Sequence, residues 1–456
     1  MPRIGPSDCR RLALIDGVNA TGLACEPSAL AREIGGMPNK ESVMSVETLA
    51  TRNASPRLVR SLTLTHAVLY GLGVTIGAGI YVLVGIAAGR SGMHAPLAFI
   101  GAAVVMAFSA ASFAELGTRM PVSASEAAYV QAAFRRDWFS LAVGLLVVAT
   151  ATISAATISV GSAGYVAVFL PVAAPWIISG VVLAMGAVAC LATVQSVTFA
   201  GIMTVIEVAG LVLIIVAGFS HGTDVVTRLP EIWPSAGDPK VWVGIAGTSL
   251  IAVFAFIGFE HLVNVAEEMK EPSRTLPRAL FLTLGLTALV YALVVWIAVT
   301  AVPPQELARS SAPLALVFER LTGLPLVTMS AVAIVATLNG IIVHMIMIAR
   351  VIYGLADQGS LPKAFTRLNG VTHTPLLATA IGVGAILVLA LAVPLAGLAD
   401  LTARFTLVVF VVVNLALIRI KSASEAPPSG AFICPGWVPF AGVVSSVLLL
   451  VVDFVV

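Results

Sequence analysis

The chain has 456 residues, of which 59% are hydrophobic and only 11% are charged, and its mean hydropathy is +1.03. No water-soluble domain of this length could carry that composition on its surface, so the sequence predicts an integral membrane protein surrounded by the lipid bilayer. The net charge of +2 comes without a basic patch, so nucleic acid is not an expected partner.

Residues 1–60 are polar and mixed in composition. They contain no apolar run near the start, so they are not expected to be a cleaved signal peptide, and we predict a disordered cytoplasmic tail. Met37 and Met44 are alternative start sites to Met1, and the sequence does not choose among the three.

Apolar runs of about 20 residues, each long enough to cross a hydrocarbon core of about 30 Å, recur from residue 65 onward. They lack the alternating pattern of a porin strand, so the predicted class is all-α with about eleven transmembrane helices. The predicted spans are 65–88, 95–118, 138–163, 176–194, 197–219, 242–265, 277–301, 325–354, 375–394, 399–419 and 438–456.

Lysine and arginine are unevenly divided between the short loops. Positively charged flanks are retained in the cytoplasm, and the loops on the N-terminal side hold most of these residues, such as Arg119, Lys270 and Arg350. We therefore expect a multi-pass protein of the cell (inner) membrane with a cytoplasmic N-terminus.

Residue patterns for chemical catalysis are missing from the sequence. The cysteines are widely separated, so neither a disulfide framework nor a metal site is expected. The spans contain no HExxH or GxSxG motif and no cluster of histidine with carboxylate. We expect no catalytic residues and no cofactor, and we do not expect an enzyme.

Two of the spans are interrupted. Residues 71–80 read GLGVTIGAGI, and the sixth span reads VFAFIGFEHLVNVAEE, in which Gly258 precedes the polar residues Glu260 and Asn264. Glycine inside a helix costs about 0.5–1 kcal/mol relative to alanine. For one such stretch, close packing of helices is an equally good explanation. The sixth span, however, has its break at the place that corresponds to the break in the first span. Two corresponding breaks favour unwound helix segments over close packing as the explanation.

The matching breaks predict two copies of a five-helix unit that are inverted relative to each other. Residues 61–220 would form the first repeat, 241–420 the second, and 431–456 an eleventh helix. An amphipathic segment follows the second span, PVSASEAAYVQAAFRR, and a counterpart follows the seventh, PPQELARSSAPLALVFERLTG. Inverted copies would place these two segments on opposite faces of the membrane.

Unwound segments free backbone groups in the middle of the membrane, and the N-terminus of the resuming half-helix favours an anion. Amides of the first break can bind a carboxylate, and carbonyls of both breaks can accept hydrogen bonds from an ammonium group. A zwitterionic amino acid fits both ends. The predicted substrate-binding residues are Thr75, Ile76, Gly77, Ala78, Gly79, Phe254, Ala255, Ile257 and Gly258.

Four separated stretches match a known family in order. They are TIGAGIYVLVG, ASFAELGTRMPVSASEAAYV, FAFIGFEHLVNVAEEMKEPSRTLPRAL and ARVIYGLADQGSLPKAFTRLNGVTHTP. Through them, residues 60–456 resemble the amino acid–polyamine–organocation (APC) superfamily of permeases, especially its cationic amino acid transporter-like branch.

The resemblance implies the LeuT-like APC fold, with broken helices 1 and 6, and secondary active transport of amino acids or related amines. It also implies that Thr75 to Gly79 form the carboxylate-binding break, that Phe254 closes over the substrate, and that Ile257 and Gly258 form the second break. The chain departs from many relatives by stopping after an eleventh helix.

Two carboxyl groups are candidates for coupling transport to an ion. Glu207 stands where some proton-coupled relatives have a lysine, so the role of that lysine cannot be carried over unchanged. At its depth a carboxyl group is protonated or paired, so Glu207 either binds the coupling proton or is a neutral hydrogen-bond strut. Glu260 is the second candidate, with a structural tie to span 1 or 8 as the alternative. Residues His261, Asn339 and His344 are interpreted as helix-packing groups.

These features predict a permease that imports amino acids by alternating access, coupled to protons or alternatively to sodium. An exchanger and a carrier of polyamines or other organic amines are alternatives within transport. A membrane sensor or a channel is the alternative from another class, although no soluble output domain and no continuous polar lining are found. The small residues of the third span favour neutral amino acids.

Overall fold

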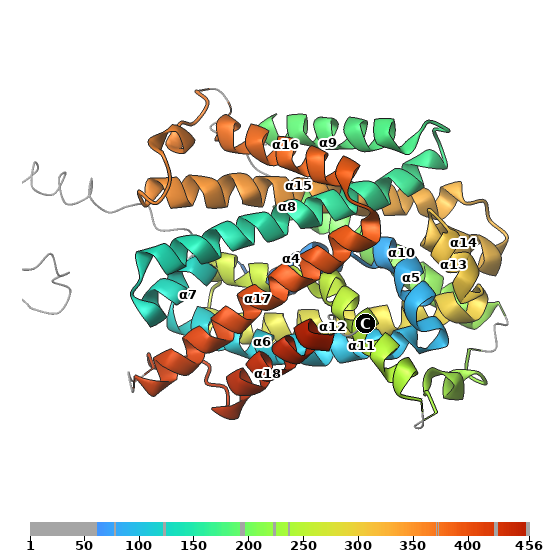
Figure 1. Cartoon of the computed structure of the whole chain (residues 1–456), viewed down its shortest axis with the longest axis horizontal. Helices are drawn as coiled ribbons and strands as arrows, with labels where there is room; N and C mark the ends of the chain where they lie inside the picture. The colour runs from blue at the N-terminus through green and yellow to red at the C-terminus, as the bar shows by residue number, and fades with distance from the viewer. Residues whose placement is uncertain are drawn as a thin grey trace, which may run out of the picture. The chain divides into compact units, whose positions relative to one another are not determined.

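The computed structural model describes residues 62–76, 79–121, 125–191, 197–221, 225–235, 238–370, 372, 374–423 and 427–452. Within these ranges the regular elements are all helices, and the one β-type pairing is an isolated bridge between Leu62 and Met269. The predicted all-α class is therefore confirmed (Figure 1). The predicted tail, residues 1–60, lies outside the described residues.

Every predicted span has a helical counterpart. Eight helical stretches of the described chain are long and apolar enough to cross a membrane, and three shorter apolar helices accompany them. The elements are α4 (Leu64–Ile76), α5 (Gly79–Ser91), η1 (Gly92–His94), α6 (Ala95–Arg119), α7 (Ser125–Phe134), α8 (Asp137–Ala167), α9 (Ala174–Leu191), α10 (Val197–Ser220), η2 (Leu229–Ile232), α11 (Pro239–Phe256), η3 (Phe259–Glu268), α12 (Pro272–Ala301), α13 (Pro304–Arg309), α14 (Pro313–Thr322), α15 (Val327–Asp357), η4 (Lys363–Thr366), α16 (Leu376–Ala392), α17 (Leu395–Ser422) and α18 (Trp437–Val452).

The sixth span is broken where its glycine stands, and the first span is described as two helices, one on each side of residues 77–78. The first span consists of α4, which ends at Ile76, and α5, which begins at Gly79. In the sixth span α11 ends at Phe256, Ile257 is extended, and Gly258 has a φ of 123°, a backbone conformation that favours glycine. The chain then resumes as the 3-10 helix η3. The predicted break of the sixth span is confirmed, whereas Gly77 and Ala78 of the first predicted break lie outside the described residues, so that break stays a prediction.

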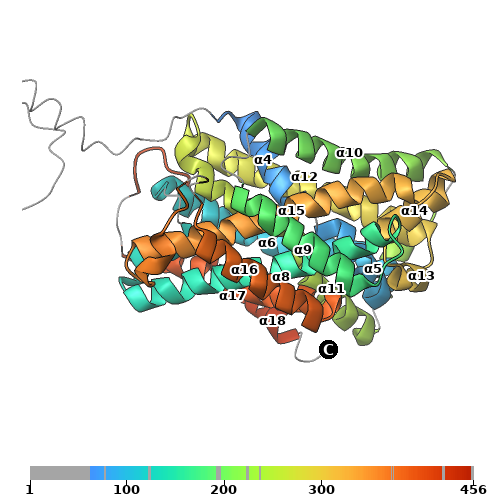
Figure 2. The same cartoon turned by 90° about the horizontal axis from the view of Figure 1, so that it is seen from above.

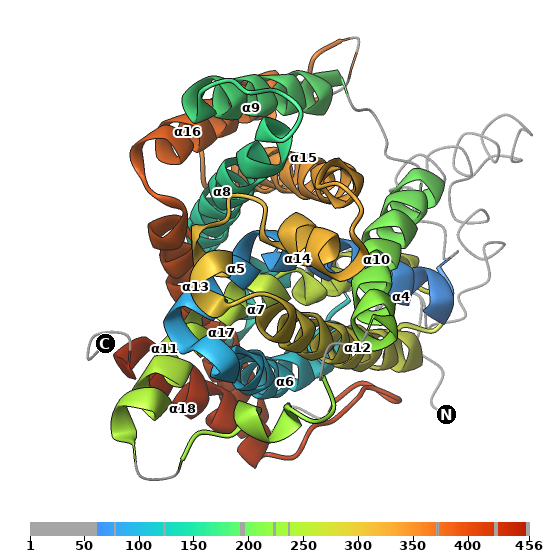
Figure 3. The same ribbon diagram turned by 90° about the vertical axis from the view of Figure 1, so that its right-hand side faces the viewer.

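Corresponding helices of the two halves pack against each other. The contacting pairs are α5 with α11, α6 with α12, α8 with α15, and α9 with α16. Figures 1 and 2 show α8 beside α15, and Figure 3 shows α9 and α16 together at one edge of the bundle. Such pairing is what two repeats related by a two-fold axis in the membrane plane produce. The limits 61–220 and 241–420 remain predictions.

The amphipathic segments also form helices. The segment after the second span forms α7, and the segment after the seventh forms α13 and α14.

At the start of the first span, the Leu62 amide donates to the Glu268 carbonyl at 2.9 Å, and the Lys270 amide donates back to the Leu62 carbonyl at 3.1 Å. These two hydrogen bonds join Leu62, which lies just before α4, to the end of η3.

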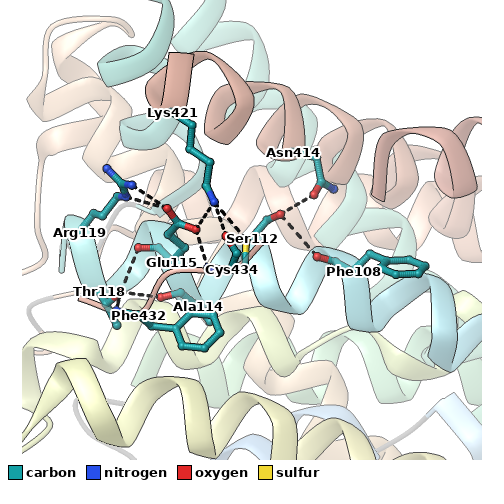
Figure 4. A network of polar contacts seen from close by, with 10 residues as sticks. All are labelled: Phe108, Ser112, Ala114, Glu115, Thr118, Arg119, Asn414, Lys421, Phe432 and Cys434. Atoms are coloured by element: carbon teal, nitrogen blue, oxygen red, sulfur yellow. Dashed lines mark hydrogen bonds and ion pairs between the residues drawn. The ribbon is translucent and has the colours of Figure 1, made fainter. Parts of the chain in front are cut away.

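A buried ion cluster joins α6, α17 and the segment before α18 (Figure 4). The Glu115 carboxylate is 2.7 Å from the Arg119 guanidinium and 2.8 Å from the Lys421 ammonium, and it accepts from the Cys434 amide at 2.9 Å. Two cations and an amide offset the cost of burying this carboxylate. Burial, together with the neighbouring Glu115, raises the pKa of the Cys434 thiol to about 11, so that the thiol stays protonated at neutral pH.

Candidate functional site

The two breaks cross each other in close contact. A Cβ atom added to Gly79 would lie 2.6 Å from the Cα atom of Ala255, and one added to Gly258 would lie 2.7 Å from the Val74 carbonyl oxygen. Real Cβ atoms do not approach backbone this closely. Each break therefore needs its glycine to let the other backbone approach, and the first break touches the second at two points.

Tyr291 on α12 bridges the two breaks. Its hydroxyl contacts the Thr75 carbonyl oxygen at 2.9 Å and the Ala255 carbonyl oxygen at 3.0 Å, and it can donate to either. The Ala255 carbonyl lies in the last turn of α11, where the helical hydrogen bonds end, and the Thr75 carbonyl lies next to the last described residue of α4. The fully buried ring also packs against Phe99 and Phe256. Tyr291 thus satisfies backbone groups that the unwinding leaves open.

A cavity, here called the upper cavity, lies at the crossing. Of the predicted residues, Thr75, Gly79, Phe254 and Ile257 line it. Ile76, Ala255 and Gly258 are buried at the breaks beside it. Gly77 and Ala78 lie outside the described residues. From other helices, Ser154 and Ile158 of α8 and His344 of α15 complete the wall.

One predicted acceptor is already in use. The Phe254 carbonyl, expected to be free for an ammonium group, accepts a hydrogen bond from the Ile257 amide at 3.2 Å. The Thr75 hydroxyl is likewise occupied, since it donates to the Gly71 carbonyl at 2.8 Å within its own helix. The Thr75 carbonyl keeps a second lone pair beside Tyr291, so the first break retains an acceptor at this site.

Glu207 lies on α10, fully buried beside α15. Its Oε1 accepts from the Asn339 side-chain amide at 2.9 Å, so Asn339 does hydrogen-bond between helices. Its Oε2 has no hydrogen-bond partner among the described residues. The Tyr81 hydroxyl donates to the Glu207 carbonyl at 2.8 Å, which holds α10 against the start of α5. One carboxyl oxygen is thus buried with its hydrogen-bonding capacity unused.

Glu260 bonds within its own break. Its Oε2 accepts from the Gly258 amide at 2.9 Å, whereas a tie to span 1 or 8 was the expected structural role. Its Oε1 is 4.0 Å from the His261 Nε2 atom. The short, two-residue separation explains the difference, because the side chain reaches the amide exposed by the turn before it can reach another helix.

The structure also brings together groups that the sequence analysis kept apart. No histidine–carboxylate cluster was expected in the spans, yet Glu260, His261 and His344 line one cavity together with Glu126 of α7. The rings of His261 and His344 have centroids 6.4 Å apart. Tyr291 was also missed. The only sequence signal for it was a hydroxyl-bearing ring at membrane depth, which needs a partner when buried.

Comparisons with known proteins agree on one family. A family model described as "Amino acid permease" matches residues 62–456. The branched-chain amino acid permease BcaP of Bacillus subtilis is 27% identical over 426 residues, which cover 88% of this chain and 89% of BcaP. An uncharacterized transporter of Mycobacterium tuberculosis is 29% identical over 406 residues, 88% of each chain. The vacuolar cationic amino acid transporter 2 of Arabidopsis thaliana is 28% identical over 417 residues, 83% of this chain and 64% of the plant protein.

Proposed function

Because the chain belongs to the amino acid permease family, and is therefore a membrane-embedded amino acid transporter, we propose that it imports its substrate across the cell membrane in symport with protons. The observation that carries the proposal is the close approach of the first span to the broken sixth span at one cavity. Alternating access then consists of opening that cavity to one side of the membrane at a time.

The substrate is proposed to bind across the breaks. Its carboxylate lies at the N-terminus of α5, where the amide of Gly79 and the helix dipole favour an anion. Its ammonium group donates to the Thr75 carbonyl. Its side chain lies against Ile158, Phe254 and Ile257, which are apolar. A neutral aliphatic amino acid fits this wall best, and one relative is named a branched-chain amino acid permease.

Glu207 is proposed to bind the coupling proton. Its unpartnered Oε2 favours a protonated state in the structure described, since a buried carboxylate oxygen without a partner is costly. Its partner Asn339 is next in sequence to Gly340, which lines the upper cavity. A change in its protonation can therefore alter the α10–α15 contact next to the bound substrate.

Uptake into proteoliposomes tests the function. Labelled amino acids are offered in sodium-free buffer, with and without an inward proton gradient. We expect saturable uptake of neutral aliphatic amino acids that increases with the gradient. Uptake that ignores the gradient, together with fast exchange in preloaded vesicles, would identify an exchanger. Uptake that needs sodium would replace the proton as coupling ion.

Glu207→Gln is expected to reduce gradient-driven accumulation about tenfold and to change exchange between preloaded vesicles less than about twofold, because only net transport requires the proton. Glu231→Gln is the matched control, since Glu231 lies in an exposed ion pair with Arg228. Full gradient-driven accumulation by Glu207→Gln would make the coupling role wrong.

A further inference from the structure

A second cavity, here called the lower cavity, adjoins the upper one. Five of its polar lining residues come from four elements: Glu126 from α7, Ser154 from α8, Glu260 and His261 from η3, and His344 from α15. The two cavities share Ser154 and His344, which therefore form the wall between them, together with Ile257. Through α7 the lower cavity reaches the side of the molecule that the sequence analysis predicts to be cytoplasmic.

The hydrogen bonds of His344 fix which nitrogen is basic. Its Nδ1 lies 2.8 Å from the Gly340 carbonyl oxygen, which can only accept, so Nδ1 carries a hydrogen. Its Nε2 lies 3.0 Å from the Ser154 hydroxyl, which donates to it in the neutral ring. The lone pair of Nε2 therefore faces the wall between the two cavities. A proton arriving from the upper cavity can bind there while the Ser154 hydroxyl turns away.

Beyond His344 lie two buried ionisable groups. His261 is only 6% exposed and Glu260 only 5% exposed. The Nε2 atom of His261 lies 4.0 Å from Oε1 of Glu260, whose Oε2 accepts from the Gly258 amide. These two groups are thus placed to hold a proton or the water that carries it.

The charges around the cavity favour a cation. Its ionisable lining residues are Glu126 on α7, Glu260 and His261 on η3, and His344 on α15. The lining residues that come from α8 and α17 are not ionisable, and no lysine or arginine is among the described lining residues. The ionisable groups that a proton meets in this cavity are thus carboxyl and imidazole groups, which can accept it.

We propose that the lower cavity is the release site of the coupling proton on the cytoplasmic side. His344 takes a proton at Nε2 from the upper cavity and becomes an imidazolium. It then loses that proton, through water, to His261 or Glu260, and Glu126 passes it to the cytoplasmic solution. Each group returns to its starting state, so one proton moves and no co-reactant is needed. The proposal rests on the proton coupling of the proposed function.

His344→Gln tests the proposal, because glutamine keeps hydrogen bonding at this position but cannot take a proton there. We expect gradient-driven accumulation to fall at least about tenfold, in line with the loss of a proton-transfer group. Because His344 also lines the upper cavity, exchange in preloaded vesicles reports any effect on substrate binding, and accumulation should fall several-fold more than exchange does. A pH-sensitive dye trapped in the vesicles should report a matching loss of proton entry. His94→Gln is the control, since His94 also contacts a backbone carbonyl, that of Ile232, but lies outside both cavities.

His261→Gln is the second variant, because His261 lines the lower cavity but not the upper one, where the substrate is proposed to bind. As for His344→Gln, we expect gradient-driven accumulation to fall much more than exchange in preloaded vesicles. Equal loss of accumulation and exchange in both variants would assign a structural role and overturn the proposal. Proton-driven accumulation that both variants keep at the wild-type level would overturn the release site while leaving the proposed function standing, whereas wild-type transport without any proton effect would contradict both. Absence of exchange in the wild type would instead contradict the proposed function.

Discussion

Gly258→Ala is expected to reduce the initial rate of uptake at least tenfold. Gly258 has a φ of 123°, and a Cβ there would lie 2.7 Å from the Val74 carbonyl oxygen. The backbone strain alone costs about 1–3 kcal/mol, and about 1.4 kcal/mol corresponds to a factor of ten. Because Val74 lies in α4 directly before the first predicted break, the clash pushes apart the two segments between which the substrate is proposed to bind. Initial rates in proteoliposomes, normalised to the amount of monodisperse protein, give the measurement.

Gly285→Ala is the matched control. Gly285 lies within α12, and no atom lies within 4 Å of an added Cβ. Alanine is the better helix former by about 0.8–1 kcal/mol, so this variant should keep wild-type uptake and equal or higher stability. If Gly258→Ala transported as fast as Gly285→Ala, close approach of the two breaks would not be needed for transport.

The helices and their breaks could be predicted because both follow from local rules. A run of apolar residues as long as a bilayer is thick has to be a helix in lipid, and each predicted span has one. The sequence places Glu260 two residues after Gly258, and this spacing predicts a break because glycine and buried charge both weaken a membrane helix. The segment after the second span showed its amphipathic pattern, and it forms α7.

The partners of the polar groups could not be predicted, because they depend on which helices meet. Tyr291 contacts carbonyls 216 and 36 residues away along the chain. Glu115 and Arg119 have the spacing of an ion pair within one helix, but the charge from Lys421 that completes their cluster comes from α17.

The lower cavity illustrates the same limit. His261 and His344 are each isolated in sequence, and a single histidine in a helix is usually a packing group. Only the contact between η3 and the bundle places both rings in one cavity with Glu126 and Glu260. A cluster of this kind is assembled by tertiary structure, so its chemistry cannot be read from the spacing of the residues.

Tyr291→Phe is expected to raise the KM for amino acid uptake about tenfold with a smaller change in maximal rate. Removal of the hydroxyl leaves the Thr75 and Ala255 carbonyls without their donor, and an unsatisfied buried group costs about 1–3 kcal/mol. The phenylalanine ring keeps the contacts with Phe99 and Phe256, so packing is preserved. The loss therefore acts on the geometry of the breaks, where the carboxylate and ammonium groups of the substrate are proposed to bind.

Tyr129→Phe separates this effect from the general loss of a buried hydroxyl. The Tyr129 ring is fully buried, and its hydroxyl has no hydrogen-bond partner among the described residues. Its removal should leave KM unchanged and should not lower the unfolding temperature, since no bond is broken. Tyr291→Phe should lower the unfolding temperature and raise KM together. If both variants kept the wild-type KM, the bridge between the breaks would be a feature of packing alone, and the substrate would be positioned by the backbone contacts at Gly79 and Gly258 without help from α12.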